Sequence, residues 1–118
     1  MTSLRVADDE TWWTALGVVP AAEARSGDEL VRELIYPVTD SEAVHVTWDV
    51  TDSSVRVRHR RAEATVTDLF REMATLVTVA GTAAVAEILI EYGSPAYSGR
   101  LRVRVFPEVH VEDTLVRS

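Results

Sequence analysis

AVHVTWDVTDSSVRVRHR, residues 43–60, decides the expected fold more than any other stretch of this 118-residue chain. Apolar and polar residues alternate over 43–50 and again over 55–60, which is the pattern of two half-buried strands. The intervening residues 51–54, TDSS, are typical of a turn. We therefore expect an antiparallel hairpin with one valine-rich buried face and one polar face.

The same alternation predicts how the two strands pair. A one-residue slip would expose Trp48 and the valines to water, so burial determines which side chains face the core. A loop of two or four residues gives the pairs Val50–Val55, Trp48–Val57 and Val46–His59 on the buried face, and Asp49–Arg56, Thr47–Arg58 and His45–Arg60 on the polar face.

Two short helices are expected before the hairpin. An acidic start and a suitable C-cap at Gly17 favour a helix within residues 8–16. Residues 28–36, DELVRELIY, have apolar side chains at helical spacing and end before Pro37. A strand over 31–36 is the alternative.

The segment 66–81 predicts a long amphipathic helix. Thr67 or Asp68 can cap its start and Gly81 can end it. Its apolar residues follow the spacing of one buried stripe. They are Val66, Leu69, Phe70, Met73, Leu76, Val77 and Ala80. We expect this helix to cover the valine face of the sheet.

The last third of the chain is expected to add strands. Residues 83–92 are ambiguous, because their Ala-rich start favours a helix and their alternating second half favours a strand, which we prefer. Residues 93–99 have turn composition, and 101–106 alternate as a second strong strand. Val109 and Val111 continue the same alternation beyond Pro107, which predicts that the strand extends through a bend at this proline. Because proline cannot donate a ladder hydrogen bond, that strand should lie at an edge or carry a bulge.

Together these elements predict a single α+β domain over residues 1–118. The expected architecture has two layers: a mostly antiparallel sheet of four or five strands packed against the long helix, plus short N-terminal helices. The composition, 47% hydrophobic and 26% charged, is ordinary for a globular protein. A chain of this size can bury a core without metal or disulfide support.

The composition and motifs exclude several classes of site. There is no cysteine, which rules out disulfides, thiolate metal sites and cysteine nucleophiles. The sequence has no phosphate-binding glycine loop, nucleophile elbow or zinc motif. His45 and His59 fall on opposite faces of the expected hairpin and cannot share a metal. We therefore expect no metal, no cofactor and no catalytic residue.

The charge balance is acidic, with 12 basic residues against 19 carboxylates and a formal net charge of −7. Residues 1–52 carry three arginines and eleven carboxylates, a net −8, and residues 53–118 carry nine and eight, a net +1. This balance argues against binding to nucleic acid or to an anionic membrane. All basic residues are arginine, which is typical of high-GC bacterial coding, with selection for guanidinium geometry as the alternative.

Nothing in the sequence predicts export or membrane insertion. The acidic residues 8–10 interrupt any signal-peptide core, and the longest weakly charged stretch, 73–86, is too short to span a bilayer. We expect a bacterial, cytoplasmic protein.

Five arginines are candidate partner-binding residues. Arg56, Arg58 and Arg60 share one face of the hairpin, and Arg102 and Arg104 share one face of the later strand. If both strands belong to one sheet, all five emerge on the same outer face. Such a face either docks an acidic partner or an anionic ligand, or is a solvated surface of cross-strand ion pairs.

The adjacent Trp12 and Trp13 are the other candidate partner-binding residues. A short helix cannot bury both on one face, so one should be exposed, at an interface or in a cleft. Alternatively, the aromatic residues line a pocket in which His59 acts as a general base oriented by Glu63 or Asp68. A half-buried structural histidine is the simpler interpretation.

These features predict a non-catalytic protein-interaction domain of the immunity, antitoxin, regulatory or assembly type. It would bind another protein, or itself as a homodimer, through charged and aromatic surfaces. The alternative is a small cofactor-independent enzyme or ligand carrier of bacterial secondary metabolism with an aromatic-lined pocket. An empty apolar pocket would favour that alternative. A filled core with an exposed tryptophan and a charged face would favour protein interaction.

Overall fold

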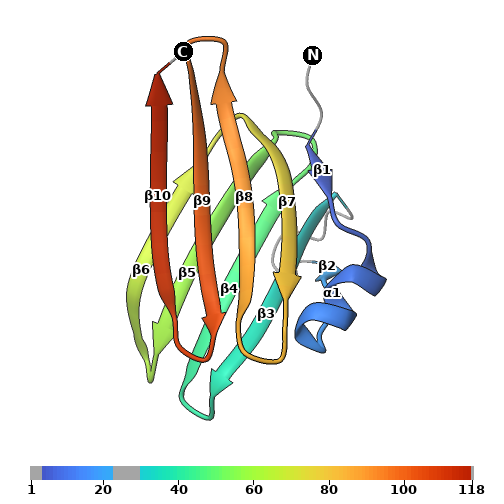
Figure 1. The fold of residues 1–118 in the computed structure, drawn as a ribbon, viewed down its shortest axis with the longest axis vertical. Coiled ribbons are helices and arrows are strands. Elements are labelled where there is room, and N and C mark those ends of the chain that lie inside the picture. Colours follow the sequence, from blue (N-terminus) through green and yellow to red (C-terminus); the bar gives the residue numbers. More distant parts are fainter. Residues whose placement is uncertain (1–3, 23–29, 118) are drawn as a thin grey trace.

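The computed structural model describes residues 4–22 and 30–117, which form a sandwich of two five-stranded β-sheets (Figure 1). Sheet A has the strand order β1-β7-β8-β9-β10 and sheet B the order β2-β3-β4-β5-β6. All neighbouring strands are antiparallel except β1 and β7. The described residues contain one helix, α1 (Asp9–Leu16), which lies on the β1 and β2 side of the sandwich.

The strands of each sheet come from consecutive parts of the chain, apart from β1. Sheet A contains β1 (Arg5–Val6), β7 (Ala74–Gly81), β8 (Ala86–Ser94), β9 (Tyr97–Phe106) and β10 (His110–Arg117). Sheet B contains β2 (Ala21–Ala22), β3 (Val31–Thr39), β4 (Glu42–Asp49), β5 (Ser54–Arg61) and β6 (Ala64–Arg71). The chain therefore crosses from one sheet to the other between β6 and β7.

The predicted α+β architecture is wrong, because a second sheet takes the place of the long helix. The segment 66–81 forms most of β6 and all of β7, which belong to different sheets. The apparent helical spacing arose from reading two alternating strands across their junction. Threonine and valine are frequent in this segment, and such β-branched residues favour strands. Phe70 and Met73 of the expected buried stripe are exposed.

The expected helix over 28–36 is also wrong, and the strand alternative is correct. Residues from Val31 onwards form β3, whereas 28 and 29 lie outside the described residues. β3 is a long strand between β2 and β4, and its buried Leu34 lies opposite Val46. Backbone pairing of β3 with β2 and β4 outweighs the helix that the spacing of its apolar residues favoured.

The helix α1 is confirmed, together with its acidic start and its C-cap at Gly17. The Asp8 carboxylate accepts hydrogen bonds from the backbone N–H of Thr11 at 2.8 Å and from its hydroxyl at 2.7 Å. These bonds lower the pKa of Asp8 from its usual value. Gly17 ends the helix in the left-handed conformation, with φ +73°, which suits a residue without Cβ.

The hairpin of β4 and β5 is confirmed and the same side chains face the core, but the predicted register is wrong by two residues. Trp48, instead of Val50, lies opposite Val55. The Asp49 carboxylate accepts hydrogen bonds from the backbone N–H groups two and three residues further on. This Asx turn ends the strand at Asp49 and leaves Val50 in the turn.

The preference for a strand within 83–92 is confirmed by β8, and the strand over 101–106 is confirmed by β9. The expected continuation past Pro107 is wrong, because the chain reverses there. Residues 110–117 return as β10, and Val111 lies opposite Val103. Pro107 lies in the connecting turn, so β10 rather than β9 is the edge strand of sheet A.

The core lies between the two sheets and contains a tryptophan stack. The ring centroids of Trp12 and Trp48 are 5.7 Å apart, with an interplanar angle of 12°. The indole N–H of Trp12 donates to the Ala7 carbonyl at 3.0 Å, so this buried polar group has a partner. The stack joins α1 to sheet B. Around it pack Leu34, Val44, Val46, Val55 and Val57 from sheet B and Val77, Ile88, Ile90, Leu101, Val103 and Val105 from sheet A.

Trp48→Ala should lower the free energy of unfolding by about 3–5 kcal/mol, because it leaves a cavity in the core and removes half of the stack. Trp13→Ala is the matched control, since Trp13 is 62% exposed and should change stability by less than about 0.5 kcal/mol. Urea denaturation followed by far-ultraviolet circular dichroism measures both. A Trp48→Ala midpoint equal to that of the wild type would contradict this core.

Candidate functional site

The five candidate arginines lie on two opposite faces of the sandwich. Arg56, Arg58 and Arg60 alternate with buried residues of β5 and project from the outer face of sheet B. Arg102 and Arg104 alternate with buried residues of β9 and belong to the outer face of sheet A. The common face that one shared sheet would create is absent from the described structure, because β5 and β9 are in different sheets.

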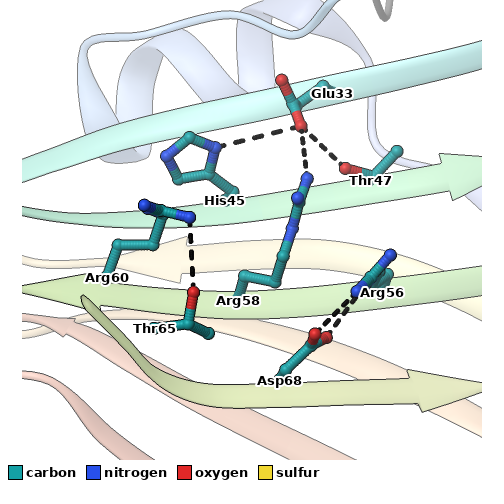
Figure 2. Close-up of polar contacts among 8 residues, drawn as sticks. All are labelled: Glu33, His45, Thr47, Arg56, Arg58, Arg60, Thr65 and Asp68. Atoms are coloured by element: carbon teal, nitrogen blue, oxygen red, sulfur yellow. Dashed lines mark hydrogen bonds and ion pairs between the residues drawn. The ribbon is translucent and has the colours of Figure 1, made fainter. Parts of the chain in front are cut away.

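A network around Glu33 occupies the outer face of sheet B (Figure 2). One carboxylate oxygen of Glu33 accepts hydrogen bonds from the Thr47 hydroxyl at 2.9 Å and the Arg58 guanidinium at 3.1 Å. The Nδ1 of His45 lies 3.9 Å from the same oxygen. These side chains come from the adjacent strands β3, β4 and β5, and most of their surface is buried. The network therefore holds a carboxylate, a guanidinium and an imidazole in defined positions.

The other two arginines of this face differ in their partners. Arg56 forms a bidentate ion pair with Asp68 of β6, at 2.9 and 2.6 Å. This pair raises the pKa of Arg56 and lowers the pKa of Asp68. Arg60 donates to the Thr65 hydroxyl at 3.3 Å (Figure 2). It also donates to the Glu63 carbonyl at 3.3 Å, and among the described residues it pairs with no carboxylate. Its charge is therefore left available at the surface.

Large apolar side chains lie among these charges. Ile35 is in register with His45, and Phe70 is in register with Arg56, so both share the outer face of sheet B. Both are about half exposed. We define the β3–β6 face as Glu33, Ile35, His45, Thr47, Arg56, Arg58, Arg60, Asp68 and Phe70.

The arginines of sheet A are mostly neutralised by neighbouring strands. Arg102 pairs with Glu87 at 3.0 and 3.3 Å, which raises the pKa of Arg102. Arg100 pairs with Glu91 at 3.2 Å. Arg104 lies beside a small hollow of about 390 Å³ that also contains Glu108 and His110.

The two candidate tryptophans have different environments. Trp12 is completely buried in the stack with Trp48, so it offers no surface to a partner. Trp13 is exposed, as expected for one of the two. The expected candidate pair is thus reduced to Trp13, which lies on α1 and not on the β3–β6 face.

His59 faces the core, and its partner is Glu42 rather than Glu63 or Asp68. The Nε2 of His59 lies 2.6 Å from a Glu42 oxygen, which Arg61 also approaches to 3.2 Å. The hydrogen bond from His59, more than the effects of Arg61, lowers the pKa of Glu42 from its usual value. The arrangement places a satisfied polar pair at one end of the core.

Sequence reasoning did not find Glu42, because it lies one residue before the expected start of the strand. Alternation along the strand could have identified it. Glu42 is an even number of residues from the buried Val44 and Val46, so its side chain is predicted to point inward with theirs.

A second polar cluster joins the two sheets and was also missed. Asp113 of β10 accepts hydrogen bonds from the Tyr92 hydroxyl of β8 and from Arg71 of β6, each at 2.6 Å. Burial and the bond to Asp113 raise the pKa of Tyr92. Burial also acts to raise the pKa of Asp113, but the bonds from Tyr92 and Arg71 outweigh it and lower that pKa. The Tyr92 ring covers Gly99, where a Cβ would collide with it.

The apolar core packs between the two sheets, and a hollow lined by residues of both sheets opens at the surface. It is an open groove of about 1320 Å³ whose lining includes Asp52, Phe70, Met73, Tyr97 and Glu112. Within residues 4–22 and 30–117, no group of three histidine or acidic residues is placed to hold a metal ion. In the same residues no helix is long and apolar enough to cross a membrane.

The fold has a counterpart among solved structures. No protein-family model matches the sequence, and no curated protein matches it. The chain resembles one chain of a contact-dependent growth inhibition toxin–immunity protein complex from Klebsiella pneumoniae 342, with a TM-score of 0.78. The likeness covers 98% of this chain and 100% of the other, at 10% sequence identity. The two chains share a fold. At this identity the likeness does not extend to individual site residues.

The His45 environment predicts a specific dependence of stability on pH. Burial lowers the pKa of His45 below its ordinary 6.5; Glu33 opposes this shift, whereas Arg58 and Arg60 add to it. As the pH falls below 6.5, the unfolded chain therefore takes up this proton before the folded chain does, and stability decreases.

His45→Gln should remove this contribution, so the stability of the variant relative to the wild type should rise as the pH falls from about 7 to 5. Urea midpoints across this range measure the effect. His110→Gln, at an exposed position on β10, controls for the loss of a histidine. If the difference in urea midpoint between His45→Gln and the wild type did not vary with pH, the prediction would be contradicted.

Proposed function

We propose that this protein is a non-catalytic, immunity-type protein that neutralises a toxin by binding it. The observation that carries the proposal is the full-length likeness to a chain of a toxin–immunity complex, at a TM-score of 0.78. A binding function requires a stable, pre-shaped surface rather than a reactive site. The β3–β6 face has that character, and we assign it as the partner-binding surface.

The chemistry of the β3–β6 face supports this assignment. Arginine and aromatic side chains contribute most of the energy at many protein interfaces, and here Phe70 is half exposed and Arg60 is partly buried. The bonds of Glu33 hold Thr47 and Arg58 in place before any partner arrives. Side chains that are already ordered lose less conformational entropy on binding.

The charge of the whole chain favours a partner of positive net charge, whereas the β3–β6 face, with three arginines against Glu33 and Asp68, suits an acidic patch on that partner's surface. A net charge of −7 produces a field that attracts a positively charged protein and accelerates association. The association rate should therefore fall as salt is added, since the attraction between exposed charges is screened.

The filled core supports protein binding over a ligand carrier. The tryptophan stack and the facing valines pack between the sheets, where a ligand carrier would need an apolar cavity. Trp13 is exposed and the β3–β6 face is charged, which is the combination expected of an interaction protein.

The experiment begins with gentle purification of the tagged protein from its source cells, followed by native mass spectrometry. A co-purifying polypeptide is then expressed alone in a test host and together with this chain. The proposal expects growth arrest in the first case and normal growth in the second. A partner that is harmless alone, or toxicity that this chain does not relieve, would reject the immunity function.

Phe70→Ala should weaken binding of that partner at least about tenfold, or ~1.4 kcal/mol, because it removes an aromatic anchor from the β3–β6 face. Phe106→Ala is the matched control. Phe106 is 42% exposed, against 52% for Phe70, and it lies at the end of β9 in the other sheet. Isothermal titration calorimetry measures both affinities. Weakening by Phe106→Ala alone would move the binding surface to sheet A.

A further inference from the structure

Four strands form the edges of the two sheets, and three of these edges are protected from pairing with another chain. In the described residues β1 and β2 have two residues each. β6 departs from regular pairing at a register shift opposite His59 and Arg60. Short strands and bulges are the usual means by which proteins protect sheet edges.

β10 lacks these forms of protection. It has eight residues, and its pairing with β9 runs from His110 to Arg117 without a register shift. It contains no proline and no lysine, and in the described part of the chain β9 is its one strand neighbour (Figure 1). In an antiparallel strand every second residue directs its N–H and C=O away from the paired side. Within residues 4–22 and 30–117, β10 therefore presents a row of backbone donors and acceptors that no other strand pairs.

The side chains of β10 also favour pairing. Leu115 is 63% exposed, and the neighbouring Val116 is exposed as well. Asp113 points inward, and an inward charge at an edge normally opposes the addition of a strand. Here Tyr92 and Arg71 each donate to one oxygen of that carboxylate, so part of its charge is compensated within the sandwich, and each oxygen can still accept a second donor.

We propose that β10 binds a second copy of this chain, joining the two five-stranded A sheets into one continuous sheet. The two β10 strands run antiparallel, with a two-fold axis at Leu115. Leu115 then lies opposite Leu115 of the second copy, and Asp113 lies opposite Arg117 of the second copy. Thr114 and Val116 form the remaining pair. This inference does not depend on the proposed function.

Charge complementarity selects this register. An axis at Asp113 would place the two aspartates directly opposite each other, and like charges in that position destabilise a sheet. An axis at Thr114 would place Asp113 opposite the apolar Leu115. The axis at Leu115 instead gives one apolar pair flanked by two opposite-charge pairs, so the strand is complementary to itself.

Sedimentation equilibrium over a range of concentrations tests the proposal on the full chain. The wild type should form a reversible dimer of twice the 13.1 kDa chain mass. Leu115→Arg places two cations together at the axis and should raise the dimer dissociation constant more than about tenfold. Val66→Arg is the matched control, because Val66 is 53% exposed on the other long edge strand, β6, and its substitution should leave the dimer intact.

A second pair of variants tests the register and remains informative if Leu115→Arg fails to fold. Arg117→Glu should weaken the dimer because it opposes Asp113, whereas Arg117→Lys should retain it. Circular dichroism spectra establish that each variant is folded. A wild type that stays monomeric at every concentration would overturn the proposal. The proposal would also be overturned if the Val66→Arg variant were monomeric while the Leu115→Arg variant remained a dimer. That result would place the interface at β6.

Discussion

Burial of the apolar sides of two facing sheets is the interaction on which the rest of the structure depends. The inner long strands contribute buried valine, leucine or isoleucine side chains to one shared core, and the edge strands β6 and β10 pack Leu69 and Val111 against it. Trp12 and Trp48 occupy this core as a stacked pair, which ties α1 to sheet B. Since side chains alternate along each strand, apart from the register shifts, burying one set forces the other set to the two outer faces.

Polar side chains complete the sandwich where the apolar core ends. His59 and Glu42 form a close pair at one end of sheet B, and Arg71 crosses from β6 to Asp113 in sheet A. Both contacts give buried or half-buried groups the partners that they need. They also link segments far apart in the chain, so they help to hold the hairpins and the two sheets together.

The two proposed binding modes use different physical properties of this sandwich. The β3–β6 face offers ordered charges and a half-exposed aromatic residue, which suit a partner of complementary shape and charge. The β10 edge offers backbone groups that can pair with another strand, and such pairing needs little complementarity between side-chain shapes. An open sandwich has both kinds of surface because its sheets, unlike a closed barrel, leave edge strands.

The sequence by itself determined which residues of each strong strand face inward, because period-two alternation is a property of a single strand. It predicted the hairpin of β4 and β5, the strands β8 and β9, and the capped helix α1. The tertiary structure alone decided that 66–81 is two strands in different sheets, and hence that Arg56 and Arg102 lie on opposite faces. The hairpin register was decided by a local contact, the Asx turn at Asp49, which alternation by itself does not reveal. Local periodicity carries no information about which distant segment covers a strand, since that choice depends on packing between sheets.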